Sequence, residues 1–84
     1  MNVDDLKNKA VFYAKEFKET GQLNIKFKEN EHTQEEWYLI LGLSQVYYNL
    51  MQGVYTREKA IEEQKKAFAF IKDNKSYFEE LRNG

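Results

Sequence analysis

The first part of the chain has the spacing of an amphipathic helix. Apolar residues between Val3 and Thr20 recur every three or four positions, which is the period of a helix with one buried face. Asn2 precedes this run and is suited to cap its first turn, while Gly21 follows it as a typical C-terminal stop. The pattern therefore predicts a helix over residues 3–20.

The next segment, residues 22–31, changes to a period of two. Leu23, Ile25 and Phe27 alternate with polar residues, which is typical of a short strand. No second strand is predicted in the chain, so this one has no internal partner. We therefore expect either an extended connection whose apolar side chains cover the core, or an edge strand that pairs with a second copy or a partner's sheet.

The second predicted helix is apolar around most of its circumference. It opens at Thr33, which forms a capping-box sequence with Glu36, and it runs to about Gln52, before Gly53. Its remaining polar strip carries no formal charge. The strip consists of Gln34, Tyr38, Gln45, Asn49 and Gln52. A helix this apolar must be buried on more than one side, so we expect it to be the central element.

The third predicted helix has a narrow apolar stripe and a charged remainder. Thr56 caps it, and it continues to about Lys72. The stripe consists of Ala60, Ile61, Gln64, Ala67, Phe68 and Ile71. The Ser-x-x-Glu sequence that begins at Ser76 then predicts a short final helix over residues 77–82. Together these elements predict an all-α fold, a small bundle of three main helices plus a short C-terminal helix, in one domain over residues 1–84.

Composition removes several classes of function. The chain has 84 residues with no cysteine, which excludes disulfides, a thiol nucleophile and cysteine-based metal centres. The net charge of −1 gives no general attraction to nucleic acid or to an anionic membrane. The start of the chain lacks the pattern of a signal peptide, and the long uncharged run over residues 37–56 contains too many polar residues for a membrane span. We expect a cytoplasmic protein.

Candidates for catalysis are few. His32 is the only histidine, and it lies near several glutamates, but we expect it to pack on Trp37 where the helix begins rather than to bind a metal. The sequence contains no glycine-rich phosphate loop, nucleophile elbow or calcium loop. We therefore expect no catalytic residues, no metal, no cofactor and no enzymatic activity.

Two groups of residues are candidates for binding a partner. Phe12 and Phe70 lie off the apolar stripes of their helices, so each either packs on the connection or the final helix, or anchors a partner. Tyr38 and Tyr55 are further aromatic candidates. The second group is acidic and is either solvated or complementary to a basic groove. It consists of Glu29, Glu31, Glu35 and Glu36.

The segment from Tyr38 to Lys66 combines a tyrosine-containing apolar helix, a glycine turn and a Thr-Arg-Glu-x-Ala helix start. Its residues are Tyr38-Leu39-Ile40-Leu41-Gly42-Leu43, Tyr47-Tyr48, Gly53, Thr56-Arg57-Glu58-Lys59-Ala60 and Glu63-Gln64-Lys65-Lys66. In this combination the chain resembles small helical proteins of bacteriophages and prophages of Firmicutes. The resemblance implies an accessory or counter-defence factor, such as an inhibitor that binds a CRISPR nuclease without chemistry.

The leading hypothesis is a non-enzymatic protein-binding module, a phage-encoded inhibitor that occludes a nuclease or another nucleic-acid-binding enzyme of a bacterial host. One alternative is a dimeric helix-turn-helix-like DNA-binding regulator, with the third helix as its recognition helix. The glutamates of that helix disfavour contact with nucleic acid. The other alternative is a structural or assembly protein that self-associates through its second helix, and a homodimer is also open.

Overall fold

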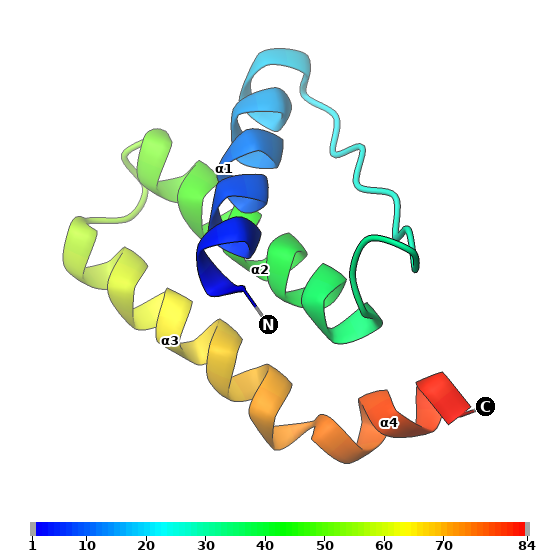
Figure 1. Ribbon diagram of the computed structural model, residues 1–84. Helices are drawn as coiled ribbons and strands as arrows, with labels where there is room; N and C mark the ends of the chain where they lie inside the picture. Colours follow the sequence, from blue (N-terminus) through cyan, green and yellow to red (C-terminus); the bar gives the residue numbers. More distant parts are fainter. Residues whose placement is uncertain (1, 84) are drawn as a thin grey trace.

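Four helices make up most of residues 2–83, the part of the chain that the computed structural model describes, with side chains described as far as Glu80 (Figure 1). They are α1 (Val3–Thr20), α2 (Gln34–Met51), α3 (Arg57–Asp73) and α4 (Lys75–Asn83). Residues 2–83 contain no strand. The predicted all-α fold is confirmed, and residues 22–28 form an extended connection.

The helix starts follow the capping residues in the sequence. Asn2, Thr33 and Thr56 each accept a hydrogen bond from the backbone N–H three residues further on, over 3.1–3.3 Å. At the start of α2 the Glu36 carboxylate also accepts from the Thr33 N–H at 2.9 Å, which completes the capping box. At the end of α1, Gly21 adopts a φ of 72° and donates to the Phe17 carbonyl, a conformation that glycine adopts without steric cost.

Helix α2 runs between α1 and α3, which pack on different sides of it (Figure 1). It supplies most of the buried side chains: Trp37, Leu39, Ile40, Leu43, Ser44 and Val46. Helix α1 faces them with Leu6, Ala10 and Ala14. The predicted central position of the second helix is confirmed. No helix within residues 2–83 has the length and apolar character that crossing a membrane requires.

The connection covers one end of this core. Ile25 packs against the core, and the Phe27 ring stacks on that of Trp37 at a centroid distance of 5.9 Å. The indole N–H of Trp37 donates to the Lys28 carbonyl at 2.9 Å, so this fully buried ring leaves no unsatisfied donor. Residues 22–28 are thus an extended connection, and Ile25 and Phe27 are the side chains with which it covers the core.

Helix α3 is less buried than its apolar stripe predicts. Only Ala60 is buried, while Phe68 and Ile71 pack half-buried against the core. Ile61 is 56% exposed and does not join the core. The hydroxyl of Tyr47 on α2 donates to the Gln64 side chain at 2.9 Å, and burial raises the pKa of this tyrosine.

The last helix begins two residues earlier than predicted. The Asn74 carbonyl already accepts from the Phe78 N–H at 3.2 Å, so Lys75 is the first helical residue and Ser76 lies inside the first turn. The Asn74 side chain donates back to the Phe70 carbonyl at 2.8 Å, which fixes the bend between α3 and α4. This bend turns α4 toward the start of α2, where Phe78 is buried (Figure 1).

Gly42 lies in the middle of α2, where α3 approaches. A Cβ at this position would lie 3.7 Å from the Cβ of Ala67, which is ordinary van der Waals contact. We expect Gly42→Ala to raise the free energy of unfolding by roughly 0.5–1 kcal/mol, because alanine loses less backbone entropy in a helix. Gly42→Leu should lower it by about 1–3 kcal/mol through overpacking. Urea unfolding followed by circular dichroism measures both, and stabilisation by leucine would contradict the packing of α3 on α2.

Candidate functional site

Aromatic side chains from several parts of the chain meet around the buried ring of Phe78 on α4. The centroids of Tyr38, Phe70 and Tyr77 lie 5.4, 6.4 and 5.5 Å from that of Phe78. Phe27 of the connection extends the group, since its ring meets Tyr38 edge-on at 5.4 Å. We call Phe27, Tyr38, Phe70 and Tyr77 the aromatic surface.

The rings of the aromatic surface are half-exposed, and three of them rest on the buried ring of Phe78. Phe27 and Tyr38 are 39% and 37% exposed, and Phe70 and Tyr77 are 56% and 54% exposed, whereas Phe78 is only 1% exposed. Edge-to-face packing holds such rings in place, so little side-chain entropy remains to be lost on binding. Contiguous exposed aromatic groups are typical of protein-binding sites.

Sequence reasoning found half of this surface. Tyr38 and Phe70 were candidates, and the structure brings them to the same place. Phe27 and Tyr77 were missed, as was the central Phe78. For Tyr77 and Phe78, the signal in the sequence was two adjacent aromatic residues in an otherwise polar C-terminal segment. That signal did not show in which direction the bend at Asn74 would turn them.

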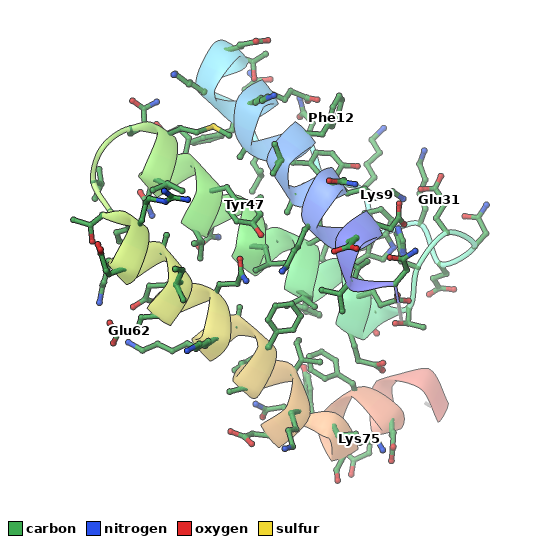
Figure 2. The ribbon with its side chains drawn as sticks, turned by 60° about the vertical axis from the view of Figure 1, so that its left-hand side comes forward. Lys9, Phe12, Glu31, Tyr47, Glu62 and Lys75 are labelled. Carbon is green, nitrogen blue, oxygen red and sulfur yellow. The ribbon has the colours of Figure 1, made fainter. Side chains whose placement is uncertain are left out.

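The other aromatic candidates lie elsewhere. Phe12 is 61% exposed and meets only the edge of Tyr13 among the described rings, on the side of α1 that faces away from α3 (Figure 2). Tyr55 lies half-buried in the turn between α2 and α3, beside Glu63 and Lys66. Neither residue belongs to the aromatic surface.

The four acidic candidates do not form one solvated patch. Glu31 is engaged by Lys9 at 3.4 Å and by Lys28 at 3.8 Å, and Figure 2 shows Lys9 and Glu31 side by side. Glu36 is occupied by the capping box, and Glu35 is half-buried. Glu29 is exposed. Of the four carboxylates, Glu31 is thus the one that neighbouring lysines offset.

His32 packs edge-on against Trp37 at 5.0 Å, as expected from the sequence. Its Nε2 lies 2.6 Å from the Lys9 ammonium, which also lies 5.4 Å from the Trp37 ring. An ammonium can only donate, so Nε2 accepts and the ring proton is on Nδ1, 3.8 Å from Glu36. Among the described residues, no three histidine or acidic side chains are grouped so that they could hold a metal ion.

Two lysines of α3, Lys59 and Lys66, are engaged by acidic neighbours on the same helix. Glu63 lies 3.0 Å from both Lys59 and Lys66, and Lys66 also lies 3.6 Å from Glu62. Hydrogen bonds from Lys66 and Lys59 lower the pKa of Glu63, and the hydrogen bond to Glu63 raises the pKa of Lys66. This side of α3 is a set of mutually neutralising charges.

Comparison of the chain with protein-family models, curated proteins and solved structures finds no match.

The capping carboxylate of α2 makes the stability of the fold depend on pH. Burial raises the pKa of Glu36, but the hydrogen bonds with the Thr33 backbone and side chain outweigh it and bring the pKa below its ordinary value. The ionised form therefore stabilises the folded chain above the ordinary value, about 4.3, and this contribution is lost as the pH falls through the lower, folded-state pKa.

We expect Glu36→Gln to be less stable than the natural chain at neutral pH and to match it in strong acid, because glutamine keeps a capping group but carries no charge. Urea unfolding at a series of pH values measures the difference. Glu80→Gln, on the exposed side of α4, is the control and should change little at any pH. A Glu36→Gln difference that does not vary with pH would contradict this role of the carboxylate.

Proposed function

We propose that this chain is a non-enzymatic protein-binding module that holds its partner with the aromatic surface. The observation that carries the proposal is the arrangement of three half-exposed rings around the buried Phe78, extended by the Phe27 ring against Tyr38. Rings held by edge-on packing bury large apolar area on binding at low entropic cost, and such residues dominate the energy of protein interfaces.

The partner that we propose is a bacterial enzyme. The resemblance of residues 38–66 to small phage and prophage proteins supports an inhibitor of a host defence enzyme, such as a CRISPR nuclease, in the host cytoplasm. The chain would inhibit by occlusion, because its candidate surface is apolar and presents no group that performs chemistry. Glu29 and Glu31 lie on the same connection as Phe27 and are candidates for contacts at the rim of the interface.

The DNA-binding alternative has less support. A recognition helix contacts phosphates and base edges with unpaired basic and polar side chains. In α3, Lys59 and Lys66 are already paired with Glu62 and Glu63, whose carboxylates would approach the phosphates. Desolvating these pairs against DNA would cost free energy without the release of counterions that drives such binding.

The aromatic surface is tested by photo-crosslinking in a lysate of a bacterial host. A photoreactive phenylalanine analogue is placed singly at position 70 or 77, and as matched controls at position 61 or 12, which are equally exposed but outside the surface. We expect positions 70 and 77 to crosslink to the same protein and the control positions not to. Equal crosslinking from position 61 would remove the aromatic surface from the proposal.

The affinity of the crosslinked protein for variants measures the contribution of each ring. We expect Phe70→Ala and Tyr77→Ala to weaken binding at least tenfold, about 1.4 kcal/mol or more, as interface anchors do. Ile61→Ala should leave binding unchanged, although Ile61 has the same exposed fraction as Phe70. Thermal unfolding of each variant separates lost contacts from lost folding.

Binding to a random DNA duplex separates the protein-binding module from a DNA-binding protein. We expect no binding at low salt, where electrostatic attraction to phosphates is strongest. Fluorescence anisotropy of a labelled duplex measures it. Affinity that falls steeply with added salt would favour the DNA-binding alternative instead.

A further inference from the structure

A hollow of about 310 Å³ lies between α1 and the second half of α2. Its lining includes Ala14 and Ser44, which are almost completely buried. It also includes Phe17 and Tyr48, whose rings pack edge-to-face at 4.7 Å and hold each other in place. The volume is at the small end of the range for ligand-binding pockets, and most of the lining is apolar.

Two carboxamides also line this hollow. Gln45 and Asn49 are one helical turn apart on α2, and their side chains form no hydrogen bond with any residue that the structure describes. Each carboxamide offers both a donor and an acceptor, so the pair matches a peptide group, which has the same two functions. The combination of an apolar lining and unpaired amides fits an apolar side chain with its adjoining backbone.

The absence of formal charge in the lining limits which groups can bind in the hollow. None of the seven residues that line the hollow carries a formal charge. A charged group placed here would lose hydration without gaining an ion pair from the lining, which costs free energy. The occupant is therefore a neutral segment.

The hollow and the aromatic surface each include a residue of the uncharged strip of α2. Tyr38 and Gln45 both lie on this strip, seven residues apart, which corresponds to about 10 Å along the helix axis. An extended polypeptide covers that distance in about three residues. A segment that touches the aromatic surface can therefore reach the hollow without leaving α2.

We infer that the hollow takes an apolar side chain from a neutral segment of the bound partner, and that Gln45 and Asn49 hydrogen-bond the adjoining peptide group. This inference rests on the proposed function, since the occupant belongs to the same partner. It adds a second anchoring point to the interface and specifies the chemistry of the partner segment, which is aliphatic or aromatic and uncharged.

The test uses N-acetyl-leucine methylamide as a probe, because it has one apolar side chain flanked by two peptide groups. Two-dimensional NMR of the labelled full chain follows a titration with the probe. We expect saturable shifts at Ala14, Ser44, Gln45 and Asn49, with a dissociation constant in the millimolar range. N-acetyl-lysine methylamide, which has the same two peptide groups but a longer, unbranched side chain that ends in a charged ammonium, should bind at least tenfold more weakly.

Variants separate the carboxamides from general effects of surface charge. Gln45→Glu places a carboxylate at the hollow and should lower the affinity for the leucine probe at least threefold. Gln52→Glu places the same charge on the uncharged strip but outside the hollow, and should leave the affinity unchanged. Both positions are exposed, so both variants are expected to fold, which the NMR spectrum verifies directly.

Several results would overturn the inference. Absence of shifts would show that the hollow takes no such side chain, and toluene binding as tightly as the probe would remove the role of the carboxamides. Shifts of the same residues on raising the protein concentration alone would identify a second copy as the occupant. If the probe fails while positions 70 and 77 still crosslink to one protein, the inference is wrong and the proposed function stands.

Discussion

The fold depends on α2 having more apolar surface than one neighbour can cover. Its buried side chains point toward both α1 and α3, so removal of either helix would expose part of the core. Trp37 adds the connection to this arrangement, because its ring stacks with Phe27 and its N–H requires the Lys28 carbonyl. Burial of α2 on two sides thus determines where α1, α3 and the connection lie.

Local rules explain why so much of the fold could be predicted from the sequence. Capping residues act on the backbone only three positions away, and the starts at Asn2, Thr33 and Thr56 are found where the sequence places them. The two-sided burial of the second helix is likewise a property of its own residues. The predicted start of α4 is wrong because Ser76 offers a capping side chain while the preceding Asn74 carbonyl already accepts the first helical hydrogen bond, from the Phe78 N–H.

The candidate site was harder to predict because it depends on contacts between distant residues. Tyr38 and Phe70 are far apart in sequence, and both contact Phe78 because the bend at Asn74 brings that ring between them. The surroundings of the acidic group depend on distant residues in the same way. Its pattern gave the capping bond of Glu36, which is local, but not the Lys9 side chain of α1 that pairs with Glu31.

The face of α2 that α1 and α3 leave uncovered lacks the charges that a purely solvated helix face carries. Helix α3 differs in this respect, because its exposed side carries ion pairs of Lys59 and Lys66 with Glu62 and Glu63, which favour contact with water. Tyr38, Gln45 and Asn49 instead carry no charge, so covering them costs less hydration energy than covering charged side chains, provided that their polar groups gain hydrogen-bond partners. Such a face can remain exposed to water in the free chain, and removing water from it costs less free energy than for a charged face. A surface that binds a partner reversibly needs both properties.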